Sequence, residues 1–121
     1  MVYSLSTVRL ISQTRDGIAI VSLSGKLMFD ESLMALRENV RDLLRAGVKG
    51  FVFDFTDVPH CDSSGCGELI GAYSSITKAG GRVAFVNPTA RVRALWERIR
   101  LIDIFTIFGT MAEAEAFVRR T

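Results

Sequence analysis

Hydrophobic residues recur along this chain at two periods, every second residue or every three to four residues, and these periods predict its elements. Two early runs, residues 3–11 and 17–27, are typical of strands, and Asp16-Gly17 between them predicts the turn of a leading hairpin. An amphipathic helix is then predicted to start after Asp30-Glu31-Ser32 and to stop at Gly47. Its apolar stripe is Leu33, Leu36, Val40, Leu43 and Leu44.

The centre of the chain combines its most apolar strand with a polar corner. Residues 50–55 are a short apolar run rich in strand formers. Because a helix separates this run from the preceding strand, we expect the two strands to pair in parallel through a right-handed crossover. After a polar stretch, a second helix is predicted up to Gly80-Gly81, with an apolar stripe of Leu69, Ala72, Tyr73, Ile76 and Ala79.

The last third of the chain predicts two more strands and two more helices. Residues 82–86 are a short apolar strand, and Asn87-Pro88 is typical of an N-cap followed by proline at the first helical position. Residues 104–108 predict a final strand, and Thr110 to Glu113 form a capping box that opens a last helix through Phe117. The helix after Pro88 is expected to turn Val92, Leu95, Trp96 and Ile99 inward and Arg91, Arg93, Arg98 and Arg100 outward.

This order of elements predicts one α/β domain over residues 1–121, with a mostly parallel five-stranded sheet, one leading antiparallel hairpin and four helices. A length of 121 residues, with 49% hydrophobic and 23% charged residues, suits a single globular domain. No apolar run approaches ~18 residues and no signal peptide is recognisable, so we expect a cytoplasmic protein without a membrane span. The net charge of +2 is too small to indicate nucleic-acid binding.

The two cysteines, Cys61 and Cys66, are too few for a disulfide framework and lack the second ligand pair of a zinc site. We expect two reduced and largely buried thiols, with a redox role as the minor alternative. No metal site and no cofactor are predicted.

Candidate chemistry gathers where the central strand leads into the second helix. Asp62, Ser63 and Ser64 lie where the unpaired N–H groups of a helix start point outward, and Gly65 and Gly67 allow a partner to approach the backbone closely. A cap alone needs one such polar residue. A phosphoryl group on a serine here would be stabilised by the helix N-terminus and would add ~1.5–2 negative charges. We therefore favour a switch-type binding site over a simple cap.

Catalysis is a weaker interpretation of the same residues. Ser63, His60 and Asp62 are the ingredients of a hydrolase triad, but they share one loop, whereas a catalytic base usually comes from a separate segment. The G-x-S-x-G pattern fails at Cys61, and the G-x-G-x-x-G pattern of a dinucleotide site fails at Ile70. We predict no catalytic residue and keep a serine hydrolase as the remote alternative.

At this point a family resemblance becomes visible. Residues 51–58, leading into Asp-Ser-Ser-Gly-Cys-Gly-Glu-Leu at 62–69, resemble the signature of STAS domains, the anti-sigma factor antagonist family. The resemblance continues to the end of the chain and covers nearly all of it. Its later parts are Gly80 to Val86, Val92-x-x-Leu95, Leu101 to Phe105 and Glu113-x-x-Ala116.

The resemblance implies a regulatory protein that is not an enzyme. Ser63, with Ser64 as its neighbour, would be the phosphoacceptor. The unphosphorylated form would bind an anti-sigma factor with serine-kinase activity and so release a sigma factor. Phosphorylation would block binding, and a serine phosphatase would restore it. The implied partner-binding residues are Asp62, Ser63, Ser64, Gly65, Cys66, Gly67, Glu68, Met28 and Asp30.

The chain departs from the family pattern in two places. The family often has a G-E-L-D-like run where this chain has Gly25-Lys26-Leu27-Met28, and Cys66 stands where leucine is usual. STAS domains also serve as stressosome scaffolds or as small subunits on transporter ATPases, which leaves a second family role open. An edge strand also allows a homodimer.

Overall fold

Within residues 9–28 and 32–119, which this computed structural model describes, five strands form one mixed sheet in the order β1-β2-β3-β4-β5. β1 (Arg9–Arg15) and β2 (Ile18–Ser24) pair antiparallel. The remaining strands continue the sheet in parallel, namely β3 (Gly50–Asp57), β4 (Arg82–Val86) and β5 (Ile107–Phe108). The predicted fold class is confirmed, including the leading hairpin.

The hairpin turn lies at Asp16-Gly17, as predicted. Both residues have a positive φ, 55° and 80°, which defines the type I′ turn whose twist matches that of the flanking strands. The first strand differs in extent from the prediction, because β1 continues to Arg15. Residues 3–8 of the predicted strand lie outside the described residues.

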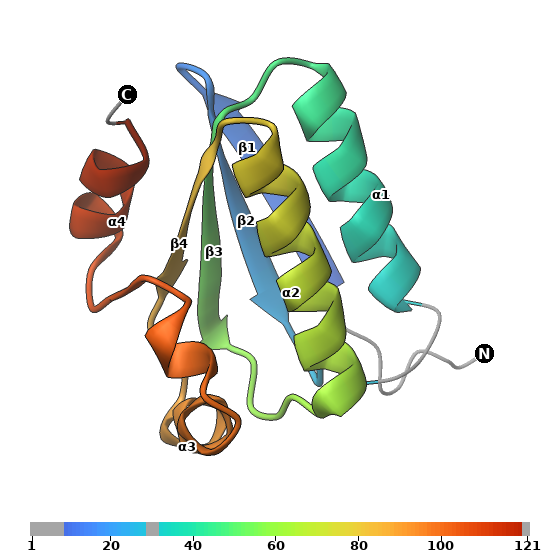
Figure 1. Cartoon of the computed structure of the whole chain (residues 1–121), viewed down its shortest axis with the longest axis vertical. Helices are drawn as coiled ribbons and strands as arrows, with labels where there is room; N and C mark the ends of the chain where they lie inside the picture. The colour runs from blue at the N-terminus through green and yellow to red at the C-terminus, as the bar shows by residue number, and fades with distance from the viewer. Residues whose placement is uncertain (1–8, 29–31, 120–121) are drawn as a thin grey trace.

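Helices cover both faces of the sheet. α1 (Ser32–Arg45) and α2 (Ser63–Lys78) lie side by side on one face, and α4 (Met111–Arg119) lies on the other (Figure 1). α3 (Ala90–Arg98) lies beyond the carboxyl ends of the strands, at the same end of the molecule as the start of α2 (Figure 1). Among the described residues, no helix is long and apolar enough to span a bilayer.

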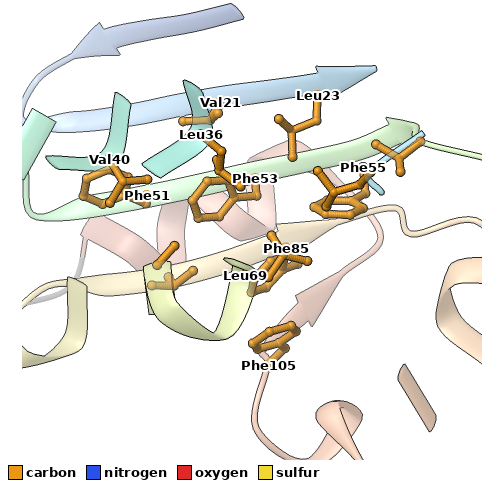
Figure 2. Close-up of a cluster of buried hydrophobic side chains, with 14 of the residues drawn as sticks. Val21, Leu23, Leu36, Val40, Phe51, Phe53, Phe55, Leu69, Phe85 and Phe105 are labelled. Carbon is orange, nitrogen blue, oxygen red and sulfur yellow. The ribbon is translucent and has the colours of Figure 1, made fainter. Parts of the chain in front are cut away.

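The main core fills the space between the sheet and the pair α1 and α2. Alternation along β3 points Phe51, Phe53 and Phe55 into this space, where they meet Leu36 from α1 and Leu69 from α2 (Figure 2). At the carboxyl end of the sheet this core becomes aromatic. The rings of Phe85 and Phe105 stack with centroids 4.2 Å apart, and Trp96 of α3 meets Phe105 edge-on at 5.2 Å.

A second, smaller core lies under α4. Val52 points away from α1 and α2 and joins Ile18, Ala84 and Val86 on the opposite face of the sheet. Ala114 and Val118 of α4 cover these residues. α4 begins at the predicted capping box, where Oγ1 of Thr110 accepts a hydrogen bond from the backbone N–H of Glu113 at 3.2 Å.

The predicted start of α3 is wrong by two residues. Thr89, not Asn87, is the N-cap, and its Oγ1 accepts a hydrogen bond from the N–H of Val92 at 3.3 Å. Asn87 still belongs to the sheet, because its N–H donates to the carbonyl of Phe108 at 3.1 Å. Its φ of 53° then turns the chain, so that Pro88 precedes the cap instead of opening the helix.

Two further details after α3 differ from the prediction. Ile99 is 43% exposed, because α3 ends there and Arg100 turns the chain with a φ of 69°. The predicted strand 104–108 is reduced to Ile107–Phe108. A short 3-10 helix, Leu101–Asp103, precedes it and directs Phe105 into the aromatic core.

Candidate functional site

The site lies where β3 ends and α2 begins, and a segment that follows β2 holds it in place. The N–H of Gly25 donates to the carbonyl of Asp57 at 3.0 Å, which continues the pairing of β2 with β3. Leu27 then bridges the connecting loop. Its N–H donates to the carbonyl of His60 at 2.9 Å, and its carbonyl accepts from the N–H of Asp62 at 3.1 Å. The loop before α2 is therefore fixed by backbone hydrogen bonds.

Asp62 is the N-cap of α2. Its Oδ1 accepts a hydrogen bond from the N–H of Gly65 at 2.9 Å, and its carbonyl accepts from the N–H of Cys66. The helix start is thus capped by the carboxylate. Ser63 and Ser64 are the first two residues of the helix; the side chain of Ser63 is exposed, and that of Ser64 is partly buried.

The two glycines of the corner have different environments. Gly65 is buried, and a Cβ built on it would lie 2.2 Å from the carbonyl oxygen of Leu27. We expected a partner to approach the backbone at Gly65. The backbone of Leu27 occupies this position instead. Gly67 is exposed, and a Cβ there would meet no atom of the described residues within 4 Å. Only Gly67 of the two presents its backbone outward.

The structure distributes the other predicted binding residues over the surface and the interior. Cys66 is buried at 2% exposure, whereas Met28 is partly exposed and follows Leu27 directly. Glu68 is partly buried and forms an ion pair with Arg37 of α1, whose guanidinium also donates from Nε to Glu68 Oε1 at 3.3 Å. These contacts raise the pKa of Arg37. Asp30 lies outside the described residues.

A groove between α1 and α2 continues from this corner, a feature that the sequence analysis did not detect. It has a volume of about 400 Å³, and Gly67 and Glu68 border it. Small residues of α2, Gly67, Gly71 and Ser75, follow one another at a spacing of four and leave the space open, opposite Arg37, Arg41 and Arg45 at the same spacing on α1. The spacing of four in both helices is the signal that could have identified it.

The ingredients of a hydrolase triad are not linked into one. Nδ1 of His60 is buried and has no hydrogen-bond partner among the described residues, whereas a triad needs an acid that orients the imidazole through this atom. Residues 9–28 and 32–119 also contain no group of three or more His, Cys, Asp or Glu side chains placed to hold a metal ion.

Both cysteines are buried just inside the corner, as expected. Each side chain is 2% exposed, and their sulfur atoms lie 3.5 Å apart. The hydrogen bond between them has opposite effects on the two thiols. It lowers the pKa of Cys66 and, together with burial, raises the pKa of Cys61.

An α/β domain with a mixed five-stranded sheet and an exposed serine at the start of its second helix agrees with the family expectation. Residues 9–114 match the family model of the STAS domain, and the chain belongs to this family. A protein of Paenibacillus polymyxa named anti-sigma F factor antagonist is 29% identical over 98 residues, which are 81% of this chain and 84% of the relative.

Solved structures share the same fold. A putative anti-sigma factor antagonist from Thermotoga maritima is 27% identical with a TM-score of 0.79, over 92% of this chain and 95% of that one. The Bacillus cell fate determinant SpoIIAA in its phosphorylated form is 20% identical with a TM-score of 0.72, over 91% of this chain and 99% of that one. The second likeness concerns the fold alone.

Proposed function

We propose that this chain is an anti-sigma factor antagonist controlled by phosphorylation of Ser63. The unphosphorylated form binds an anti-sigma factor with serine-kinase activity and so releases a sigma factor. The observation that carries this proposal is the exposed Ser63 hydroxyl at the first position of α2, on a helix start that Asp62 already caps. The names of the Paenibacillus and Thermotoga relatives support the same function.

The local electrostatics suit a switch at this position. A phosphoryl group on Ser63 adds ~1.5–2 negative charges at the positive end of a helix dipole, so the modification does not oppose the fold. The same charge stands beside the carboxylate of Asp62, on a surface that the partner must cover. A partner shaped for the neutral hydroxyl then meets an uncompensated buried charge, and binding is lost.

In this proposal the chain is a regulatory substrate and carries no catalytic residue or cofactor of its own. The kinase binds ATP and transfers its terminal phosphoryl group to Ser63, with ADP as the leaving product. A serine phosphatase restores the binding form in the cytoplasm. His60 then needs no catalytic role, in keeping with its unpaired Nδ1. Ser63 and Gly67 are the exposed residues of the docking surface, and Met28, Asp62, Ser64 and Glu68 are its partly exposed residues.

The first test is phosphorylation in vitro. The purified chain is incubated with ATP and with each kinase-type anti-sigma factor of the same genome, and its intact mass is measured. We expect one phosphoryl group on the wild-type chain and on Ser64→Ala, the matched control, and none on Ser63→Ala. The absence of an adduct with every such kinase, or an adduct that depends on Ser64, would refute the proposal.

The second test is binding of the same anti-sigma factor. Ser63→Asp should weaken binding at least about tenfold, which corresponds to about 1.4 kcal/mol. Capture of a transporter ATPase or a larger assembly that is unaffected by Ser63→Asp would instead favour the scaffold or transporter role. Labelling by a fluorophosphonate that His60→Ala abolishes would favour a hydrolase.

A further inference from the structure

The two buried thiols occupy special positions on α2. Cys61 directly precedes the N-cap Asp62, and Cys66 is the fourth residue of the helix. A hydrophobic staple joins these two positions in many helices, and the residues that form it are ordinarily aliphatic or aromatic. Here the staple consists of two sulfur atoms 3.5 Å apart. Packing alone does not require two thiols, and their separation brings them within reach of a covalent bond.

A buried polar group influences this pair of thiols. The side chain of Trp96 is fully buried, and its indole N–H has no hydrogen-bond partner in the part of the chain that the structure describes. This side chain contributes to the lowered pKa of Cys66, and at Cys61 it opposes the larger effects that raise the pKa of that thiol. A nearby donor of this kind favours a thiolate.

The two thiols have unequal roles. The contact with Cys61 lowers the pKa of Cys66, so Cys66 is the thiol that ionises first. Its place in the first turn of α2 adds the positive end of the helix dipole. Cys61 keeps its proton and remains available as the second, resolving thiol.

We propose that Cys61 and Cys66 form a dithiol modification site, which a low-molecular-weight disulfide oxidises to an intramolecular disulfide. The Cys66 thiolate attacks one sulfur of the reagent, the reagent's S–S bond breaks, and the first thiolate leaves and takes up a proton. Cys61 then releases its proton to water, and its sulfur attacks the Cys66 sulfur and expels the second thiolate. The two cysteines lose two electrons and two protons, and the reagent gains both.

The geometry allows this closure with a small movement. The sulfur atoms must approach from 3.5 Å to about 2.0 Å, which rotation of the two side chains and adjustment of one helical turn can supply. Because both thiols are buried, the reagent reaches Cys66 when the first turn of α2 opens. Helix ends open at a lower free energy cost than the core, and Ser63 in this turn is already exposed. The first exchange is therefore slow, and the ring closure after it is fast.

The bond would also affect the site described above, and this consequence rests on the proposed function. The disulfide links the residue before Asp62 to the fourth residue of α2 and so encloses Ser63 in a short covalent ring. A kinase must fit this turn into its active site. We expect the oxidised chain to be phosphorylated more slowly than the reduced chain.

The test uses the whole chain and oxidised glutathione. The reduced protein is incubated natively with the reagent, acidified and measured by intact mass, and its remaining thiols are alkylated after unfolding. We expect the loss of two hydrogen atoms, no bound glutathione, no alkylatable thiol and a monomer. Cys61→Ala should stop at one glutathione on Cys66, and Cys66→Ala should react much more slowly. Since Trp96 is the only tryptophan, its emission should change when the wild type is oxidised.

Two results would overturn the proposal. One is a native chain whose two thiols stay alkylatable after treatment, while the same reagent joins them in urea. The other is a disulfide between two chains instead of within one. Neither measurement requires a kinase or an anti-sigma factor, so a failure of the thiol chemistry can be told apart from a failure of Ser63 phosphorylation.

Discussion

At Gly65 the segment after β2 lies directly against the first turn of α2. Any side chain here would lie against the backbone of Leu27, with its Cβ 2.2 Å from the carbonyl oxygen and 3.0 Å from the carbonyl carbon. Backbone atoms of a hydrogen-bonded segment cannot move aside as the end of a flexible side chain can. The identity of this residue is therefore determined by a contact with a segment that is distant in the sequence.

We predict that Gly65→Ala lowers the free energy of unfolding by at least about 1–3 kcal/mol, because the new methyl group overpacks this contact. Urea denaturation followed by circular dichroism measures the change. Gly67→Ala is the matched control, since a Cβ there meets open space and alanine favours a helix over glycine by about 0.5–1 kcal/mol. Equal effects of the two substitutions would contradict the assigned contact.

The residues of the corner show which parts of the site are visible in a sequence. Ser63 was placed correctly at a helix start, because an acid and two serines before a helical stripe are a local signal. The burial of Gly65 was not predictable in the same way. It depends on Leu27, nearly forty residues earlier, and local patterns contain no information on that contact.

At the scale of the element, α3 is held by its cap and by its packing on the aromatic core. Oγ1 of Thr89 accepts from the N–H of Val92 and donates to the carbonyl of Val58 at 3.3 Å. One hydroxyl therefore both caps α3 and attaches it to the loop that leads to α2. Trp96 attaches the other side of α3 through its contacts with Phe55 and Phe105.

We predict that Thr89→Ala lowers the free energy of unfolding by about 0.5–2 kcal/mol, the usual range for a lost N-cap. The control is Asn87→Gly, which alters the residue that the sequence analysis took for the cap. Its φ of 53° suits glycine, so this substitution should change stability by only a few tenths of a kcal/mol. Both free energies of unfolding are measured by urea denaturation. A larger decrease in Asn87→Gly than in Thr89→Ala would show that the assignment of the cap to Thr89 is wrong.

The positions of the helices and strands were largely predictable, because hydrophobic residues recur at every second residue in the core-facing strands and every three to four residues in the helices. The errors fall where a tertiary contact overrides local preference. Asn87 is an excellent N-cap by composition, but a hydrogen bond to Phe108 holds it in the sheet. Residues 104–108 have the apolar character of a strand, but Phe105 is drawn into the aromatic core and leaves two residues for β5.

At the scale of the molecule, the sheet joins two cores that do not touch each other directly. Phe51, Phe53 and Phe55 face α1 and α2, while Val52 and Val86 face α4. Because neighbouring residues of the same strands form both cores, loosening one core strains the other. We therefore propose that the chain folds as one cooperative domain. The strand order was not predictable from the sequence, since periodicity identifies strands but not their neighbours.

We predict that Val118→Ala, a substitution in α4, shifts unfolding measured on both sides of the sheet. The lost burial should lower the free energy of unfolding by about 1–3 kcal/mol. Trp96 lies in the core on the opposite side, so its fluorescence and the far-ultraviolet circular dichroism should give one coincident, shifted transition. An unchanged midpoint by tryptophan fluorescence would mean that α4 unfolds as a separate unit.

The position of Leu27 determines how a modification at the start of α2 would affect neighbouring segments. Its amide and carbonyl hold the loop before α2, and the same carbonyl lies against the first turn of that helix. A phosphoryl group or a covalent ring that tilts the first turn of α2 must displace the backbone of Leu27. Met28, the next residue in the chain, must then move with it. A partner that touches both Met28 and Ser63 would thus sense the modification twice, once as charge and once as a displaced backbone.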